Sequence, residues 1–358
     1  MTKMTLSGTI SSKSLKEKLY KFFLTRPTGD YQMNTYSRII GTGSYFPEKI
    51  MTNKDFEKFL DTNDEWITSR TGMKERRVAE GDMYTSDLAA EAAKKALEMA
   101  GIKATDLDGI IVGTFTMDTS MPSTACRVQH KIGAGHCFAF DLTAACSGFI
   151  YGCNVANALI KTGSAKKILV IGAENLTAGL DWRDRGTCIL FGDGAGAAIL
   201  SADSEPGIHS IHTYAAGEYG ELLKQDNIGT KFLRDLKNEP IEDNMLKMKG
   251  NEIFKIAVRA MADSAQEAAD AANFKPEDID WVIPHQANLR IIDAVAKRLK
   301  VPMEQVVMNI HQYANTSAAT IPTALDQYVR EGKIKRGDNI VSAAFGGGLT
   351  WGSMSFTF

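Results

Sequence analysis

Hydrophobic and polar positions recur along the chain in two blocks that predict the same order of elements. An Ala-rich amphipathic pattern over residues 86–100 predicts a helix, and a similar pattern over residues 252–272 predicts another. Each pattern leads through a short polar loop into an unbroken apolar run, which is typical of a buried strand. The hydrophobic pattern therefore predicts two units of helix, loop and strand.

The residues around the two loops are also similar, at a fixed distance along the chain. The segment AGIKATDLDGII at 100–111 corresponds to ANFKPEDIDWVI at 272–283, and 272 minus 100 gives an offset of 172. This self-similarity predicts a duplicated βαβ-type unit, with an N-terminal half over residues 33–205 and a C-terminal half over residues 206–358. The halves continue with predicted helices at 126–132 and 290–299 and strands at 137–141, 306–310, 167–172 and 339–344.

Cys146 lies where an apolar run ends and a helical pattern begins, within TAACSG at residues 143–148. The first turn of a helix has unpaired N–H groups and the positive end of the macrodipole, which stabilise a thiolate and a developing oxyanion. Cys146 is therefore a candidate nucleophile. The simpler interpretation, a small buried hydrophobic residue, is kept for the other four cysteines, Cys126, Cys137, Cys153 and Cys188.

Asn315 and His285 are the candidate partners of this thiol. An offset of 169, which is 315 minus 146, places Asn315 at the matching turn of the second half, while Gly113 corresponds to His285. Pseudo-symmetric halves that pack together bring equivalent strand ends to a shared centre. Taken alone, His285 would be interpreted as a structural residue and Asn315 as a helix cap.

Composition and charge narrow the class of protein. The 358 residues are 44% hydrophobic and 23% charged, which is typical of a globular protein with an extensive core. A net charge of -2 gives no global signal for nucleic acid or membrane partners. The five cysteines lack CxxC pairing, which favours free thiols in the cytoplasm. The uncharged stretch 142–160 contains polar residues and glycines, so we interpret it as buried core rather than a membrane span.

Residues 1–32 differ from the rest of the chain. They are rich in Ser, Thr and Lys and contain six basic and two acidic residues, a net charge of about +4. No apolar run follows the basic residues and only one Arg is present, so a leader or an upstream start before Met33 is favoured over a targeting peptide. We predict a flexible N-terminal extension and a folded body that begins near Tyr36.

Three segments together carry a family resemblance: TAACSG at 143–148, VIPHQAN at 282–288 and ANTSAA at 314–319. In this order they resemble the β-ketoacyl-acyl-carrier-protein synthase III family of the thiolase superfamily. Single matches of this length would be weak evidence, but the ordered set extends over nearly all of residues 33–358. The further matching segments are IIGTGSY at 39–45, WITSRTG at 66–72, DRGT at 184–187, FGDGAGA at 191–197 and AFGGG at 344–348.

The resemblance implies an α/β thiolase-like fold, with two pseudo-symmetric halves and mixed sheets in a layered α/β/α/β/α arrangement. It also implies a homodimer that condenses a short acyl-CoA, acetyl-CoA first of all, with malonyl-acyl carrier protein to initiate type II fatty acid synthesis. A condensing enzyme of polyketide or secondary metabolism is the alternative within the superfamily. A Cys-His-Asn thioester hydrolase and a non-catalytic binding paralogue are alternatives of other classes.

The resemblance further assigns a role to individual residues. Cys146 would carry the acyl group, His285 and Asn315 would stabilise the enolate formed by decarboxylation, and the backbone N–H groups of Cys146 and Gly347 would form the oxyanion hole. No metal and no cofactor are expected, because acyl-CoA is a substrate and phosphopantetheine arrives on the carrier protein. The remaining implied residues are Thr62, Trp66, Arg70, Arg185, Asn288 and Arg290 for CoA; Arg290, Lys297 and Arg298 for carrier-protein docking; and Met121 and Phe345 for the acyl pocket.

Overall fold

The computed structural model describes residues 35–226 and 245–358, so the predicted extension at 1–32 lies outside the described residues. The described residues belong to one compact unit, Asn34–Phe358. Its first strand, β1, spans Tyr36–Tyr45, as the sequence predicts for the start of the folded body. Within the described residues, no helix is long and apolar enough to cross a membrane.

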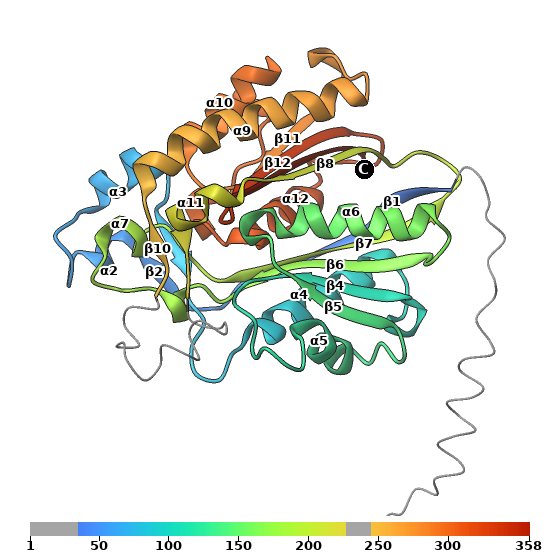
Figure 1. Cartoon of the computed structure of the whole chain (residues 1–358), viewed down its shortest axis with the longest axis horizontal. Coiled ribbons are helices and arrows are strands. Elements are labelled where there is room, and N and C mark those ends of the chain that lie inside the picture. The colour runs from blue at the N-terminus through green and yellow to red at the C-terminus, as the bar shows by residue number, and fades with distance from the viewer. Residues whose placement is uncertain (1–34, 227–244) are drawn as a thin grey trace, which may run out of the picture. The chain divides into compact units, whose positions relative to one another are not determined.

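Two mixed β-sheets form the framework of the unit (Figure 1). In each sheet, parallel pairs at one side are joined to antiparallel pairs at the other. The first sheet has the order β1, β7 (Gly194–Asp203), β6 (Lys167–Glu174), β4 (Gly109–Gly113) and β5 (Phe138–Leu142). The second has the order β11 (Trp281–Pro284), β12 (Asn339–Gly346), β13 (Thr350–Thr357) and β8 (Ile208–Ala215).

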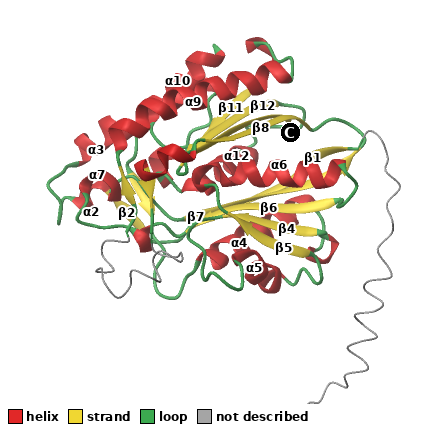
Figure 2. Ribbon diagram, in the orientation of Figure 1, coloured by secondary structure: helices red, strands yellow, loops and turns green. Residues whose placement is uncertain are grey.

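Helices cover both sheets and separate them, which confirms the predicted α/β/α/β/α layering (Figures 1 and 2). The two helices between the sheets are α6 (Gly148–Lys161) and α12 (Thr320–Arg330). Because α6 packs against both sheets, its Phe149, Ile150 and Ile160 side chains are fully buried. The outer layers are formed by α4 (Thr85–Ala100) and α5 (Thr124–Ile132) on the first sheet, and by α9 (Gly250–Ala271) and α10 (Leu289–Leu299) on the second.

Short elements at one end of the layers surround the candidate site. They pack against the apolar cluster around Phe56 and Ile67 and against the second sheet. These elements are β2 (Ile50–Thr52), α2 (Asn53–Phe56), α3 (Asp64–Thr71), β3 (Glu75–Arg77), α7 (Arg185–Cys188), β9 (Leu223–Lys224), β10 (Lys247–Met248) and α11 (Ile310–Tyr313).

The internal repeat extends further in the structure than in the sequence, at a single offset. The starts of β1 and β8, β4 and β11, α6 and α12, and β6 and β12 are all 172 residues apart. The same offset relates two 3-10 turns, η2 (Ala145–Ser147) and η8 (Ser317–Ala319), whose first residues both have left-handed backbones, with φ of 45° and 51°. The offset of 169 was therefore wrong: Cys146 is equivalent to Ala318, and Asn315 lies three residues ahead of the matching position.

The predicted strand at 306–310 is also wrong, because its backbone groups are bonded elsewhere. Val306 forms only an isolated bridge with Val282, and helix α11 begins at Ile310. The Gln286 side chain donates to the Val307 carbonyl at 3.2 Å and accepts from the Asn309 N–H at 3.2 Å. A buried side chain thus satisfies groups that a strand partner would otherwise satisfy.

Gly172 provides a test of the packing between the halves. A Cβ at this position of β6 would lie 2.1 Å from the Ala318 carbonyl oxygen of η8, and main-chain atoms cannot move aside as a flexible side chain can. Gly172→Ala should lower the unfolding free energy by about 3 kcal/mol, as overpacking does. Gly217→Ala, whose Cβ would meet no atom within 4 Å, should change it by less than about 0.5 kcal/mol in the same denaturant titration. Equal effects of the two variants would contradict this account.

Candidate active site

Cys146 lies in turn η2, between the end of β5 and the start of α6. The sequence predicts the first turn of a helix, and the structure has a 3-10 turn directly before that helix. Ala145 has a φ of 45°, a strained conformation for a residue with a Cβ. This turn buries Cys146, which is only 6% exposed.

Burial governs the protonation of the thiol. It raises the pKa of Cys146 to about 12, while the Ser317 hydroxyl acts in the opposite direction. The thiol is therefore protonated at neutral pH in the resting protein. Attack on an acyl group requires that the thiol proton leave.

Asn315 is held by a backbone contact that fixes the orientation of its amide. Its Oδ1 accepts the Ser317 N–H at 2.8 Å, so the Nδ2 group is the end of the amide that remains to donate. Ala314, directly before it, has a φ of 55°, another strained position next to a candidate residue. Asn315 is 7% exposed and presents a neutral donor in a dry environment.

His285 follows strand β11 and is 1% exposed. Its Nδ1 lies 2.6 Å from the Thr320 hydroxyl oxygen at the start of α12. Burial lowers the pKa of His285 to about 3, because no nearby charge compensates the desolvation of an imidazolium. The ring is therefore neutral at physiological pH and serves as a hydrogen-bonding group rather than as a cation.

Two cavities meet at Cys146. One has a volume of about 480 Å³ and is lined by apolar side chains that include Phe115, Met117, Leu223 and Leu246. The other, of about 510 Å³, contains Cys146 together with His285 and Asn315. The structure thus brings the three predicted catalytic residues to one cavity and gives the thiol a second, mostly apolar cavity.

The glycines after β12 allow the chain to pass close to the thiol. A Cβ on Gly346 would lie 2.5 Å from the Cys146 nitrogen, so only glycine fits there. Gly347 lines the 480 Å³ cavity with Cys146, where its predicted oxyanion role requires it. Phe345 lines the cavity that contains Cys146, His285 and Asn315.

The residues predicted for the nucleotide end of CoA are stacked on one another. The guanidinium carbons of Arg70 and Arg185 each lie 4.7 Å from the centroid of the Trp66 ring. Arg185 also bonds to the Asp61 carbonyl, next to Thr62, whose buried hydroxyl has no hydrogen-bond partner. Trp66 and Arg185 are thus in direct contact.

Asn288 and Arg290 lie at the start of α10 and line the cavity of His285. The Asn288 side chain caps this helix, accepting from the Arg290 N–H at 2.9 Å, and donates to the Arg70 carbonyl at 3.0 Å. The Arg290 guanidinium lies 4.7 Å from the Phe254 ring centroid. The Arg290 guanidinium and the Asn288 amide therefore both line this cavity.

The basic side chains predicted for docking extend along the exposed side of α10. Lys297 pairs with Asp293 at 2.6 Å, and Arg298 pairs with Asp263 of α9 at 3.2 Å. Sequence reasoning missed Lys255 of α9, which lines the cavity beside Arg290. The signal was present, because Lys255 and Arg259 lie four residues apart on one side of a predicted helix.

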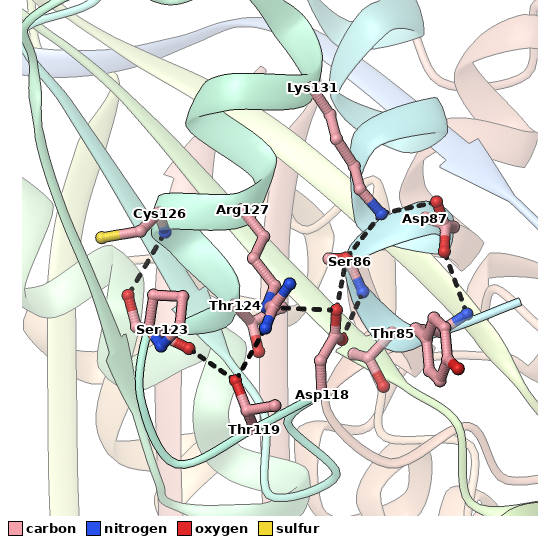
Figure 3. Close-up of polar contacts among 12 residues, drawn as sticks. Thr85, Ser86, Asp87, Asp118, Thr119, Ser123, Thr124, Cys126, Arg127 and Lys131 are labelled. Atoms are coloured by element: carbon pink, nitrogen blue, oxygen red, sulfur yellow. Dashed lines mark hydrogen bonds and ion pairs between the residues drawn. The ribbon is translucent and has the colours of Figure 1, made fainter. Parts of the chain in front are cut away.

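Met121 lines neither cavity of this chain and is 85% exposed. The loop that carries it is braced by polar contacts between α4 and α5 (Figure 3). Asp118 accepts from the Ser86 hydroxyl at 2.5 Å, and Arg127 donates to Thr119 at 3.1 Å. An exposed apolar side chain is thus presented from a fixed loop.

Two buried polar residues behind the thiol were not singled out from the sequence. Ser317 is part of the matching segment ANTSAA, and Glu174 ends the apolar run KILVIGAE. A carboxylic acid at the end of a buried strand is the signal that could have identified it. Among the described residues, no group of three or more His, Cys, Asp or Glu is placed to hold a metal ion.

Comparisons with known proteins agree over nearly the whole chain. The family described as 3-oxoacyl-(acyl-carrier-protein) synthase III matches residues 140–217, and its C-terminal region matches 269–358. A β-ketoacyl-(acyl-carrier-protein) synthase III of Xanthomonas euvesicatoria is 52% identical over 319 residues, which cover 89% of this chain and 97% of the relative.

Solved structures are similar as well. The crystal structure of 3-oxoacyl-(acyl-carrier-protein) synthase III from Aquifex aeolicus VF5 has a TM-score of 0.84 and 48% identity, covering 90% of this chain and 100% of that one. The priming β-ketosynthase of the R1128 polyketide pathway has a TM-score of 0.87 and 32% identity, covering 93% and 99%.

The neutrality of His285 predicts how stability depends on pH. Because its pKa is lowered in the folded state, from 6.5 to about 3, protonation favours the unfolded chain. The contribution of neutral His285 to the unfolding free energy is fully present above pH 6.5. It is lost as pH falls toward 3, by up to about 1.4 kcal/mol per pH unit. The difference in unfolding free energy between wild type and His285→Gln should therefore shrink from pH 6.5 to 4. An imidazole ¹⁵N titration midpoint above pH 5 would contradict the assignment.

Proposed function

The chain belongs to the β-ketoacyl-acyl-carrier-protein synthase III family and is an acyl-transferring condensing enzyme of fatty acid synthesis; from this premise we propose that Cys146 carries the acyl group through a decarboxylating Claisen condensation. The acyl donor is a short acyl-CoA, with acetyl-CoA preferred, and the acceptor is malonyl-acyl carrier protein. The observation that carries the proposal is the meeting of two cavities at one buried thiol, one holding neutral donors and the other apolar.

In the first step, the Cys146 sulfur attacks the acyl thioester. The tetrahedral oxyanion is held by the backbone N–H groups of Cys146 and Gly347, which line the same cavity as the thiol. The acyl chain then occupies the apolar 480 Å³ cavity beside Phe115 and Leu223. This cavity is larger than an acetyl group needs, so a side chain from outside this chain has room to enter it and limit the length of the acyl group.

In the second step, malonyl thioester loses carbon dioxide and leaves an enolate. The Asn315 Nδ2 group and the His285 ring both face the cavity where its oxygen would lie. In the tautomer with its proton on Nε2, the neutral His285 ring donates to the enolate; this tautomer requires the Thr320 hydroxyl, which here donates to the Ser317 carbonyl at 3.0 Å, to turn toward Nδ1. Neutral donors suit a site from which water is largely excluded.

CoA binding is proposed at the nucleotide end of the second cavity. An adenine between Trp66 and Arg185 requires a separation of roughly two stacking distances, about 7 Å, compared with the present 4.7 Å. Arg185 therefore moves away from Trp66 when the nucleotide enters. Asn288 is placed for the pantetheine arm and Arg290 for a phosphate, with Arg70 and Thr62 nearby.

Carrier-protein docking is proposed on α10, with Arg290, Lys297 and Arg298. An acidic carrier would compete with Asp293 and Asp263 for the two outer cations, so those pairs moderate the attraction. Arg290 stands closest to the thiol-bearing cavity and guides the phosphopantetheine arm into it.

A homodimer is proposed across the edge of the first sheet. Strand β5 is an edge strand with an exposed Phe140, and Met121 projects from the braced loop nearby in sequence. Pairing of the two β5 edges would cover these apolar groups. It would also place Met121 of each subunit in the acyl cavity of the other, which the subunit that contains the cavity leaves partly open. The five free cysteines support a reducing compartment, and we place the enzyme in the cytoplasm.

The polyketide alternative is weaker because the R1128 enzyme, although its TM-score is higher, is only 32% identical in sequence, compared with 48% and 52% for the fatty acid synthases compared above. Incubation of wild type with a panel of acyl-CoA primers and malonyl-acyl carrier protein, followed by mass spectrometry, tests the proposal directly. An acetoacetyl product is expected. Free acetate without that product would instead indicate the hydrolase, and absence of an acyl adduct on Cys146 would indicate the binding paralogue.

Asn315→Ala should separate the two steps. Loading of Cys146 should remain within about threefold of wild type, whereas condensation should fall by about 10² to 10³, the usual effect of removing one oxyanion donor. The control is Asn154→Ala, a residue of α6 bonded to Thr213 and outside both cavities, which should retain both steps. Equal loss of loading and condensation in Asn315→Ala would argue against a role of Asn315 in decarboxylation. Full condensation activity of Cys146→Ala would argue against Cys146 as the nucleophile.

The position of Met121 is tested with mixed dimers. One subunit carries both Cys146→Ala and Met121→Ala, and its partner is wild type, so only the wild-type thiol can react. If Met121 caps the partner's cavity, this dimer should accept longer acyl-CoA primers, about tenfold better than wild type. The reciprocal dimer, with Met121→Ala beside the only native Cys146, should keep the short-chain preference, and the opposite pattern would place Met121 in its own subunit's cavity.

A further inference from the structure

Ser317 links the surroundings of the Cys146 sulfur to a buried carboxyl group. Ser317 lines the 480 Å³ cavity together with Cys146 and lowers the pKa of its thiol, and the Ser317 hydroxyl donates to Oε1 of Glu174 at 3.1 Å. Glu174 ends strand β6, is 0% exposed, and lines neither of the two cavities. The mechanism proposed above gives this acid no task.

The other carboxyl oxygen of Glu174 is unusually well supplied with donors. Oε2 accepts from the hydroxyls of Thr114 at 3.0 Å and Thr116 at 2.5 Å, and from the N–H groups of Phe115 at 3.3 Å and Thr116 at 3.1 Å. These neutral donors favour the ionised form, while burial opposes it and raises the pKa of Glu174 to about 7. The group is therefore poised to accept or release a proton near neutral pH.

Ser317 has one hydroxyl proton for two acceptors. When Glu174 is ionised, the hydroxyl donates to Oε1 and its oxygen accepts the Cys146 thiol proton. When Oε1 is protonated, it donates to Ser317, which then donates to a thiolate at Cys146. The two arrangements have the same hydrogen bonds with opposite polarity, so a proton can pass from sulfur to carboxylate without any heavy atom moving far.

We propose that Ser317 and Glu174 form a proton relay that takes up the Cys146 thiol proton during acyl loading and returns it at the end of the cycle. This inference rests on the proposed condensation. In loading, the bond from sulfur to the acyl carbon forms, the bond from that carbon to CoA sulfur breaks, and the thiol proton ends on Oε1 of Glu174. The CoA thiolate takes a proton from solvent. In condensation, the carbon–carbon bond forms, the bond to Cys146 breaks, and the released thiolate recovers its proton through Ser317.

His285 is a poor acceptor for the same proton. Its pKa is lowered to about 3, and the tautomer that stabilises the enolate already carries hydrogen on Nε2. Two further titratable groups lie around Glu174. Cys146 is coupled to it through Ser317, and Asp193 precedes Gly194, which pairs with Glu174 across β6 and β7. Asp193 is bonded to Ala79 and Thr177 and has no contact with Ser317 among the described hydrogen bonds.

Alkylation of Cys146 by iodoacetamide, measured from pH 5 to 10, tests the relay without any acyl substrate. In wild type, ionised Glu174 takes the thiol proton as the sulfur attacks, so the rate should level off at about pH 7 and rise again only where direct loss of the proton to solvent exceeds the relay, near about pH 9. In Glu174→Gln, whose amide can keep the same hydrogen bonds, the rate should keep rising about tenfold per pH unit and be about 10² lower at pH 7. Ser317→Ala breaks the link at its middle and should also lose the plateau.

Thr114→Val is the matched control for a merely structural role. It removes one donor to Glu174 but keeps the carboxyl and Ser317, so the plateau should persist and begin at a higher pH. Identical profiles in wild type, Glu174→Gln and Ser317→Ala would overturn the relay. So would a plateau that is lost in His285→Ala and kept in Glu174→Gln. Failure of the condensation itself would appear separately, as absence of a β-ketoacyl product from wild type.

Discussion

The close approach of two backbone turns is the constraint on which the rest of the molecule depends. Turn η2 carries Cys146, and turn η8 begins two residues after Asn315. Gly346 at the end of β12 lets that strand approach η2, and Gly172 in β6 lets that strand approach η8, because neither residue places a side chain between strand and turn. The layers of helices and sheets hold these turns in contact, and the strained residues Ala145 and Ser317 are tolerated because that packing determines their conformation.

Isolation from water gives each group at the centre an unusual protonation state. The thiol keeps its proton, the imidazole stays neutral, and a carboxyl group titrates near neutrality. These shifts have the same cause, the loss of hydration, and they act in opposite directions on acids and bases. A site of this kind stabilises charge only where hydrogen-bond donors are already placed, which is the condition that an enolate needs.

Much of this arrangement could be predicted from the sequence, for particular reasons. The repeat around residues 100–111 and 272–283 predicts the duplicated fold, because helix and strand patterns are local properties of the chain. The equivalence of Cys146 with Asn315 was wrong because the loops before the two turns differ, and counting along the sequence does not reveal which residue occupies a turn. The structure shows the equivalence through left-handed backbones at Ala145 and Ser317.

Other features depend on contacts that the sequence does not display. The strand predicted at 306–310 is prevented by the side chain of Gln286, which lies more than twenty residues earlier in the chain. Glu174 is recognisable as unusual in an apolar run, but its link to the thiol requires Ser317, which lies 143 residues further along. Long-range pairing of this kind is determined by the packing of the two halves.

The equivalence of β6 and β12 has a consequence for how such a protein could arise. Glu174 and Gly346 occupy the same terminal position of their strands, 172 residues apart. In an ancestor assembled from two identical copies of one half, both positions would hold the same residue. Such an ancestor could not have both the acid at the position of Glu174 and the glycine at position 346 that lets β12 approach Cys146. Fusion of the copies into one chain removes that identity and permits the two sides of the centre to diverge.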